Sequence, residues 1–280
     1  MTDKHFLDIA ITASLEAGQV IMSVYRTDFD VDYKKDRSPL TLADQKANDV
    51  IEKYLKGLGL PVLSEESRQI PFAERKEWSE FWLVDPLDGT KEFVKRNGEF
   101  TVNIALINDH KPVMGVVYAP DLDILYFGTI DGGAYKLDCK SHLLYEARMD
   151  AETAVYDSDL LKKMADPLPI ESDKNRDKDE ITIVGSRSHG GPDLEQYIEK
   201  LKDKYQKVHF RAAGSSLKIC LVAEGAADRY PRLGPTMEWD TGAGHAVATA
   251  AGAVVLRHDS GVPLQYNKED LLNPWFMVRR

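Results

Sequence analysis

The prediction of the fold depends on the stretch Phe81-Trp82-Leu83-Val84-Asp85-Pro86-Leu87-Asp88-Gly89-Thr90-Lys91-Glu92-Phe93. Four bulky, strand-forming residues run into two carboxylates three positions apart. Pro86 separates the carboxylates and Gly89 follows them, so a type I turn explains the pattern by local chemistry alone. The same turn would hold Asp85 and Asp88 on one side, close enough to share a cation. This stretch by itself leaves both interpretations open.

The composition excludes several classes of protein. The chain has 280 residues with 43% hydrophobic and 29% charged side chains, as is usual for a globular protein with a large core. A net charge of −10 argues against a nucleic-acid polymer or an anionic membrane as the main partner. The two cysteines, Cys139 and Cys220, form no metal or redox spacing, and we expect buried, inert thiols in a reducing cytoplasm.

Two helices are expected at the N-terminus. Apolar residues recur with a helical period over 3–25, which predicts an amphipathic helix, and charges at Asp3, Lys4 and Asp8 exclude a signal peptide. The polar loop 33–39 is expected to be a solvated connector. A second helix is expected to begin at Thr41, where Thr41 and Asp44 resemble a capping box.

Short strands dominate the rest of the first half. A strand over 61–64 leads into Glu65 and Glu66, and a hairpin-like return would bring these acids beside Asp85. Further strands at 98–107, 112–118, 123–127 and from 132 are separated by turn residues, which indicates an antiparallel sheet. We therefore predict an N-terminal subdomain over 1–145, in which two helices cover an antiparallel sheet.

The second half, 146–280, alternates strands with helices, which predicts an α/β subdomain. The expected strands cover 181–186, 207–211, 225–230 and, last, 252–256. One helix is expected over 193–205, a second is expected to begin at Gly214, and a third at Trp239. The charged run 170–180 is expected to be an exposed loop.

Four acids fall at strand ends or helix starts, where side chains can converge: Glu65, Asp85, Asp88 and Asp240. Two unit charges about 4 Å apart repel by roughly 4 kcal/mol at an effective dielectric near 20. Such carboxylates stay ionised together only beside cations, and ligation by oxygen alone suits Mg²⁺. Two such ions could hold a phosphate and activate a water molecule.

Three motifs resemble the metal-site motifs of the inositol-monophosphatase superfamily. They are Leu63-Ser64-Glu65-Glu66-Ser67, Asp85-Pro86-Leu87-Asp88-Gly89-Thr90 and Glu238-Trp239-Asp240-Thr241-Gly242-Ala243-Gly244. Within that superfamily, the continuation through Lys91-Glu92-Phe93 to Leu106 and the segment Gly214 to Gly225 resemble the 3′(2′),5′-bisphosphate nucleotidases of the CysQ type. Inositol monophosphatases typically carry Thr-Asn where this chain has Lys91-Glu92. The resemblance covers essentially the whole chain and implies a layered αβαβα sandwich like that of the inositol monophosphatases and fructose-1,6-bisphosphatase.

The resemblance also implies roles for single residues. One Mg²⁺ would be bound by Glu65, Asp85 and the carbonyl of Leu87, a second by Asp85, Asp88 and Asp240, and two or three ions would occupy the site. Asp44 and Thr90 would orient or deprotonate the attacking water, with Glu65 also counted as catalytic and Glu66 placed behind the ligands. The expected substrate contacts are Glu65, Leu87, Asp88, Gly89, Thr90, Gly214, Ser215, Ser216, Lys218, Arg232 and Asp240.

Some of these contacts have plain structural alternatives. Ser215 and Ser216 could simply cap a helix, and Arg229 competes with Arg232 for a second phosphate. His189, His209 and His245 show no paired ligand spacing and are expected to be structural.

The resemblance implies a Mg²⁺-dependent, lithium-sensitive phosphatase of sulfur metabolism. It would hydrolyse the 3′-phosphate of adenosine 3′,5′-bisphosphate to AMP by metal-activated water, with the sulfated nucleotide as a second substrate. The alternatives are an inositol or sugar-phosphate phosphatase on the same metal site, or a non-catalytic Mg²⁺- and nucleotide-binding regulator. We expect a cytoplasmic protein without an integral membrane segment, leaving peripheral attachment to the inner membrane open, and a monomer rather than a dimer.

Overall fold

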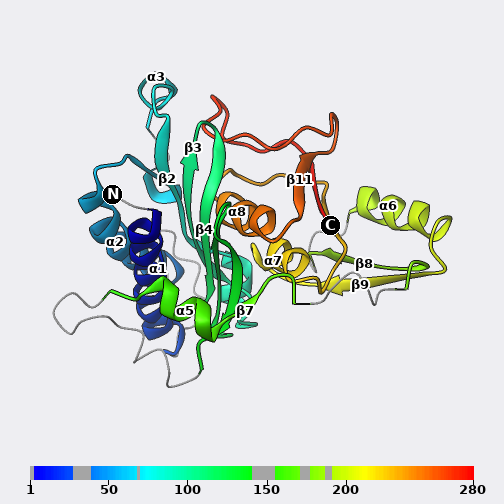
Figure 1. The fold of residues 1–280 in the computed structure, drawn as a ribbon, viewed down its shortest axis with the longest axis horizontal. Helices are drawn as coiled ribbons and strands as arrows, with labels where there is room; N and C mark the ends of the chain where they lie inside the picture. The colour runs from blue at the N-terminus through cyan, green and yellow to red at the C-terminus, as the bar shows by residue number, and fades with distance from the viewer. Residues whose placement is uncertain (1–2, 28–38, 68–69, 141–154, 171–176, 187–190) are drawn as a thin grey trace.

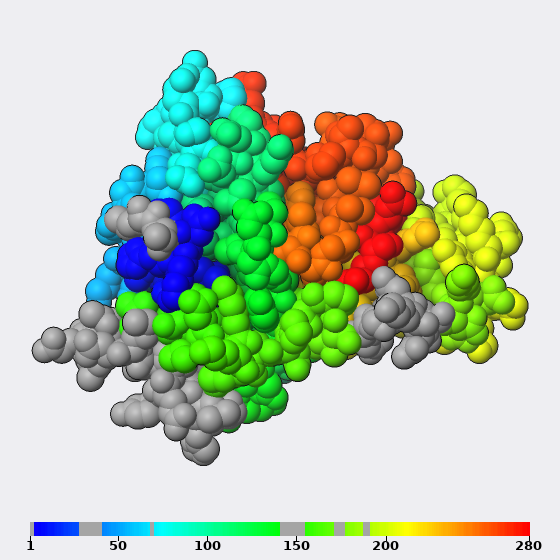
Figure 2. Space-filling model, viewed as in Figure 1, coloured from blue at the N-terminus to red at the C-terminus, as the bar shows by residue number. Residues whose placement is uncertain are grey.

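The computed structural model describes residues 3–27, 39–67, 70–140, 155–170, 177–186 and 191–280. Five layers are stacked across it: helices, a seven-stranded sheet, helices, a five-stranded sheet and a last helix (Figure 1). Figure 2 shows the orange and red part of the chain packed directly beside the blue-to-green part. The layered αβαβα architecture expected from the resemblance is therefore confirmed.

The first sheet has the order β1-β2-β3-β4-β5-β6-β7. From β2 to β7 every neighbour is antiparallel, as the spacing of strands and turns predicted. The bounds are β1 Val62–Ser64, β2 Glu80–Asp88, β3 Thr101–Asn108, β4 Lys111–Ala119, β5 Ile124–Thr129, β6 Gly133–Asp138 and β7 Asp166–Pro167.

Both faces of this sheet are buried. Along β2, Trp82 and Val84 belong to the core beneath the N-terminal helices, whereas Phe81 and Leu83 belong to the core shared with the second half. Successive side chains on a strand point to opposite faces, so an uninterrupted apolar run indicates a central strand covered on both sides. This double burial holds the end of β2 inside the molecule.

The expected hairpin between β1 and β2 is wrong. Ser64 pairs with Val84 in a parallel register, and the connection passes through the 3-10 turn η2 Glu65–Ser67 and the short helix α3 Phe72–Arg75. Parallel neighbours end at the same edge of a sheet. Glu65 therefore still lies beside Asp85, although by a different route.

Helices α1 Asp3–Tyr25, α2 Pro39–Leu55 and α5 Ser158–Met164 form the outer layer on the first sheet. The bounds predicted for α1 are confirmed. By length and composition α1 could cross a membrane, but 72% of its most apolar window is buried inside this protein. Its buried Asp8 and Thr12 accept hydrogen bonds from the backbone N–H groups of Ser158 and Tyr156, at 2.8 and 3.0 Å.

The predicted capping box in α2 is wrong. The helix begins at Pro39, two residues before Thr41, because proline tolerates the first turn, where its missing N–H costs nothing. Asp44 therefore lies inside the helix rather than in its capping turn. The 3-10 helix η1 Lys56–Leu58 follows α2 directly and ends at Gly59.

The second sheet has the order β11-β12-β10-β8-β9. Its strands are β8 Glu180–Gly185, β9 Lys207–Ala212, β10 Arg229–Arg232, β11 Val254–Arg257 and β12 Phe276–Arg279. Helices α7 Leu217–Ala223 and α8 Gly242–Ala250 lie between the two sheets, and α6 Pro192–Lys202 covers the outer face. The strand over 252–256 was expected to be the last, which is wrong. Strand β12 follows it and pairs between β11 and β10.

Four predictions fall wholly or partly on residues that the structure does not describe. The loop 33–39 and the charged run 170–180 are mostly among them, as are His189 and the boundary between 145 and 146. The first sheet continues past that boundary, because β7 pairs with β6. The division into two subdomains stays a prediction.

Candidate metal and phosphate site

A bulge in β2 creates the centre of the site. Asp85 pairs with Asn103 and Asp88 with Thr101, so β2 carries one more residue than β3 over this interval. On a regular strand, residues three apart point to opposite faces, and one inserted residue restores them to the same face. Pro86, which cannot donate to a ladder, lies in the bulge. The expected turn is thus a bulge within a continuing strand.

Local contacts hold this geometry. The backbone N–H of Leu87 donates to Oδ1 of Asp85 at 3.0 Å. Gly89 then adopts φ 95°, and a Cβ there would lie 3.2 Å from backbone atoms of Glu99 and Phe100. Only glycine accommodates both the left-handed conformation and this close approach. Helix α4 Thr90–Val94 follows immediately.

Asp85, Asp88 and Asp240 form the carboxylate cluster. Each offers one oxygen, and these oxygens lie within 4.8 Å of one another. Burial raises the pKa of Asp85 well above its ordinary value, and the nearby charges of Asp88 and Asp240 raise it further. Burial and Asp240 raise the pKa of Asp88 to about 7, and burial raises that of Asp240 to about 6. The cluster is therefore costly to ionise without a cation, and its all-oxygen donor set fits a hard divalent ion.

Two other predicted residues surround the cluster. Negative charge on Glu65 and on Asp44 also raises the pKa of Asp85, which places both acids near it. Glu65 is half-buried and Glu66 is exposed, just beyond the end of β1. Thr90 is the exposed first residue of α4, which packs against α2. The pairing of Asp44 with Thr90 stays a prediction.

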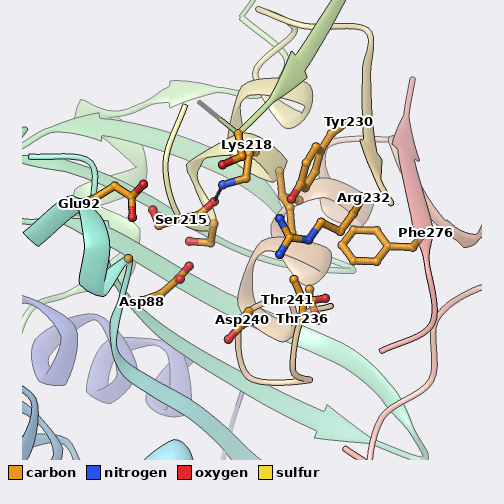
Figure 3. A pocket seen from close by; sticks show the side chains of 14 residues that line it. Asp88, Glu92, Ser215, Lys218, Tyr230, Arg232, Thr236, Asp240, Thr241 and Phe276 are labelled. Carbon is orange, nitrogen blue, oxygen red and sulfur yellow. Dashed lines mark hydrogen bonds between the residues drawn. The ribbon is translucent and has the colours of Figure 1, made fainter. Parts of the chain in front are cut away.

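A cavity opens from the carboxylate cluster toward the second half of the chain (Figure 3). On the far side from Asp88 and Asp240, Figure 3 shows Lys218, Tyr230 and Arg232, which we call the basic wall. The cavity is lined by Asp88, Gly89, Glu92, Ser186, Ser215, Ser216, Lys218, Ile219, Tyr230, Arg232, Thr236, Asp240, Thr241 and Phe276.

Lys218 and Tyr230 of the basic wall are buried, and Arg232 is half-buried. Burial lowers the pKa of Lys218 to about 8, against the opposing effect of the Asp88 carboxylate. The ammonium donates to the carbonyl oxygen of Ser215 at 2.5 Å and lies 5.8 Å from the centre of the Tyr230 ring. Arg232 donates to the carbonyl oxygen of Pro235 at 2.5 Å, while its buried Nε lacks a hydrogen bond within the described chain. A buried donor without a partner favours an anionic ligand here.

The competing residue Arg229 points elsewhere. Its guanidinium donates to the hydroxyl groups of Tyr197 and Tyr205, at 3.1 and 3.3 Å. Among the two arginines considered from the sequence, Arg232 alone lines the cavity.

The capping alternative that the sequence left open does not hold for the side chain of Ser216. Helix α7 begins at Leu217, and Ser216 makes no capping bond with its side chain. Instead, Oγ of Ser216 donates to Oδ1 of Asn103 at 2.7 Å and lies 2.8 Å from Oγ1 of Thr101. Asn103 in turn donates to Asp88 at 3.5 Å. Ser216 thus connects the second half to the carboxylate cluster.

Two further residues of the same loop behave differently. Gly214 does not line the cavity: a Cβ there would lie 2.6 Å from Cγ of Glu92 and 2.7 Å from the carbonyl oxygen of Glu99. Ser215 does line it, with φ 43° and a buried Oγ that has no hydrogen bond in the described chain. The absence of a side chain at Gly214 therefore lets this loop pack closely against Glu92 and Glu99.

Neither His209, His245 nor either cysteine lines the cavity. His245 is buried, its pKa falls to about 3 by desolvation, and its Nδ1 lies 2.9 Å from the hydroxyl of Tyr266. His209 is exposed and pairs with Glu180 on the surface. Both cysteines are buried, and burial raises the pKa of Cys139 to about 12. Neither cysteine has the low pKa of a reactive thiol.

Sequence analysis missed part of the site. It did not select Glu92, Ser186, Tyr230 or Phe276, nor the buried network through Thr101 and Asn103. A polar Asn103 within an otherwise apolar central strand was the available signal, because a buried amide requires partners.

Comparison with known proteins agrees with this geometry. The sequence model of the inositol monophosphatase family matches residues 3–275. The chain is 45% identical over 278 residues to the 3′(2′),5′-bisphosphate nucleotidase CysQ of Escherichia coli, covering 97% of this chain and 98% of that protein. It is 34% identical over 281 residues to the CysQ protein of Haemophilus influenzae, covering 99% and 93%.

Solved structures give the same result. The crystal structure of CysQ from Bacteroides thetaiotaomicron superimposes with a TM-score of 0.87 at 47% identity, covering 99% of this chain and 97% of that one. Inositol monophosphatase from Anabaena (Nostoc) superimposes with a TM-score of 0.66 at 24% identity, covering 100% and 92%, which shows the shared fold. From its full-length sequence match, its fold and its carboxylate cluster, the chain belongs to the inositol monophosphatase family.

Proposed function

We propose that this protein is a Mg²⁺-dependent phosphatase that hydrolyses the 3′-phosphate of adenosine 3′,5′-bisphosphate to give AMP and inorganic phosphate. The observation that carries the proposal is one cavity with a carboxylate cluster on one side and the basic wall on the other. Full-length relatives that are named bisphosphate nucleotidases support the same substrate.

The carboxylate cluster suits two or three Mg²⁺ ions. In this proposal Glu65, Asp85, Asp240, Asp88 and the Leu87 carbonyl are the ligands. Bound metal would lower the pKa of water and neutralise the charge that develops on the leaving oxygen. The close, buried carboxylates support this role, because they need such a cation to remain ionised at neutral pH.

The other groups near the cluster position the reactants. Asp44 and Thr90 would orient the attacking water and accept its proton. Asn103, held by Ser216, would keep the Asp88 carboxylate in its orientation. Substrate oxygens would meet Gly89, Thr90 and Ser215.

The basic wall would receive the second phosphate. Lys218 and the unpartnered Nε of Arg232 supply charged donors for a 5′-phosphate. Inositol 1-phosphate has no second phosphate and would leave both cations without an anion. The sulfated nucleotide retains a phosphate at this position and is a second substrate of the proposal.

The test is a phosphate-release assay with Mg²⁺ over a panel of adenosine 3′,5′-bisphosphate, adenosine 3′-monophosphate and inositol 1-phosphate. We expect the bisphosphate to have the highest kcat/KM. The substitution Lys218→Met should lower kcat/KM for the bisphosphate about 10–100-fold and that for the 3′-monophosphate much less, because one charge-assisted bond is lost. Lys202→Met, on exposed α6, is the matched control.

Other outcomes would favour the alternatives. Faster release from inositol 1-phosphate would reassign the protein to the sugar-phosphate phosphatases. Binding of nucleotide and Mg²⁺ without turnover would identify a regulator. Phosphate release without Mg²⁺ would contradict the proposed role of the cluster, and titration with Li⁺ would test the expected sensitivity.

The setting of the protein is part of the proposal. We propose a monomer in the cytoplasm that acts on a by-product of sulfur metabolism. Light scattering and cell fractionation test these two points.

A further inference from the structure

Among the described residues that line the cavity, Glu92 is the one acidic side chain that the proposed mechanism does not use. It lies in the first turn of α4, two residues after Thr90, and lines the cavity together with Asp88, Ser215 and Lys218. Figure 3 shows its carboxylate beside Ser215, on the side of the cavity where Asp88 lies. Its position is thus within one helical turn of the carboxylate cluster.

The stem of this side chain is held in place by packing. Its Cγ lies 2.6 Å from the point that a Cβ on residue 214 would occupy, so Gly214 is what allows the contact. The carboxylate itself has no hydrogen bond or ion pair with another described residue, although Lys218 is near enough to feel its charge. The described part of the protein therefore positions the carboxylate without giving it a hydrogen-bond donor.

The charge of Glu92 is unfavourable for an anionic substrate unless it meets a donor. It adds to the negative potential at Asp88, where it contributes to the raised pKa. A carboxylate repels phosphate oxygens but accepts strong hydrogen bonds from hydroxyl groups. The group of the anionic substrate that meets Glu92 must therefore be a neutral donor.

The chemistry of the substrate leaves one sugar group of this kind. In adenosine 3′,5′-bisphosphate the 3′ and 5′ oxygens carry phosphate, so the 2′-hydroxyl is the only free hydroxyl of the ribose. This hydroxyl is on C2′, the carbon adjacent to C3′, which carries the phosphate that is hydrolysed. A side chain one helical turn from the carboxylate cluster can reach this hydroxyl, whereas the amino group of adenine is farther along the nucleotide.

We infer that Glu92 is a specificity residue that accepts a hydrogen bond from the hydroxyl vicinal to the scissile phosphate. The inference rests on the proposed function. In this role Glu92 selects ribonucleotides over 2′-deoxyribonucleotides. A nucleotide with a 2′-phosphate would present its 3′-hydroxyl to the same carboxylate.

The test compares adenosine 3′,5′-bisphosphate with 2′-deoxyadenosine 3′,5′-bisphosphate at saturating Mg²⁺. We expect the wild-type protein to prefer the ribonucleotide in kcat/KM about 10–100-fold, the value of one hydrogen bond to a charged group. Glu92→Ala should bring this ratio close to 1, and Glu92→Gln, which retains an acceptor of the same size, should give an intermediate ratio. Glu77→Ala, at an exposed glutamate, should leave the ratio unchanged.

The outcomes separate this inference from the proposed function. Slow release from both nucleotides in the wild-type protein, with fast release from inositol 1-phosphate, would reject the proposed function itself. Good activity on both nucleotides without a ribose preference would overturn only the role of Glu92. Equal losses on both substrates in Glu92→Ala would show that Glu92 is merely structural. A changed ratio of adenosine to inosine bisphosphate with an unchanged ribose preference would place the contact at the base and overturn the inference.

Discussion

Glu238 and Asp240 are separated by one residue, yet they belong to two opposite kinds of buried acid. Glu238 accepts hydrogen bonds from the backbone N–H groups of Asn267 and Lys268, at 2.6 and 3.0 Å, and from the Lys268 ammonium at 2.5 Å. Asp240 accepts one from the backbone N–H of Met237 at 2.9 Å and otherwise faces Asp85 and Asp88.

The surroundings of Glu238 form a network that joins the two halves of the chain. Arg75 donates to Oδ1 of Asn267 and to the carbonyl oxygens of Lys268 and Glu269, at 3.0, 2.5 and 2.7 Å. Asn267 returns a bond to the carbonyl of Arg75 at 2.6 Å. We call these residues with Glu238 the Arg75 network.

The comparison shows what distinguishes a structural acid from a candidate ligand. Burial raises the pKa of both acids, but at Glu238 the Lys268 ammonium opposes the rise, whereas at Asp240 the Glu65 carboxylate adds to it. Glu238 has a direct ion pair with Lys268, whereas Arg232 and Lys218 only partly oppose the raised pKa of Asp240, which faces two further carboxylates. Removing charge should therefore have opposite consequences at the two sites.

The largest effect is expected for Asp88→Asn in the carboxylate cluster. Turnover should fall by about 10³-fold or more, because the charge that would hold metal and stabilise the leaving oxygen is lost. The Tm without metal should be equal to or above that of the wild-type protein, because repulsion is relieved. Activity assays and calorimetry in EDTA check both points, and wild-type-like turnover would contradict the two-metal proposal.

The next effect is expected for Glu238→Gln in the Arg75 network. Breaking a buried ion pair leaves Lys268 without its counter-charge, and the free energy of unfolding should fall by about 3 kcal/mol. Turnover well below the Tm should change by less than about tenfold. Denaturant titration measures the loss, and an unchanged midpoint would show that the network contributes no stability.

A smaller effect is expected from pH in the metal-free protein. The folded-state pKa values of Asp88 and Asp240, about 7 and about 6, lie above the ordinary value of 3.8. Their contribution to stability is complete below about pH 4 and is lost as the pH rises through 6 to 7, where the folded cluster must ionise. Added Mg²⁺ should therefore raise the Tm more at pH 8 than at pH 5, by an amount equivalent to about 2 kcal/mol.

Thermal scans in EDTA and in excess Mg²⁺ at four pH values measure this difference. Asp88→Asn is the matched control and should reduce it. A Mg²⁺-induced shift that is equal at pH 5 and pH 8 would argue that the metal binds elsewhere.

The smallest effect is expected for His209→Ala. His209 lies on the exposed edge strand β9 and pairs with Glu180 in solvent. Surface pairs of this kind contribute little, so the Tm should change by less than about one degree and activity should be unchanged. A large change in either would show that the outer edge of the second sheet is coupled to the site.

The periodic elements were predictable because their signals are local. The helix over 3–25 and the antiparallel order from β2 to β6 follow from the apolar period and the turn residues. The convergence of Asp85, Asp88 and Asp240 was also predicted, because the three acids stand in motifs at the ends of elements.

Long-range pairing accounts for what was missed. The parallel register of β1 on β2, the insertion of β12 and the hydrogen bonds from Ser216 to Asn103 join residues far apart in the chain. Local propensity carries no information about which of several compatible strands becomes the neighbour. The expected hairpin was wrong for this reason, whereas the capping box was wrong because α2 begins two residues earlier, at Pro39.

The sequence by itself determined which residues could form an oxygen-rich metal site and which family the chain resembles. Only the tertiary structure decided that a one-residue bulge turns Asp85 and Asp88 to the same face. It also decided that Lys218, Arg232 and Glu92 share one cavity with them. The physical reason is that the type of a side chain is written locally, whereas its burial and its neighbouring charges depend on packing between distant segments.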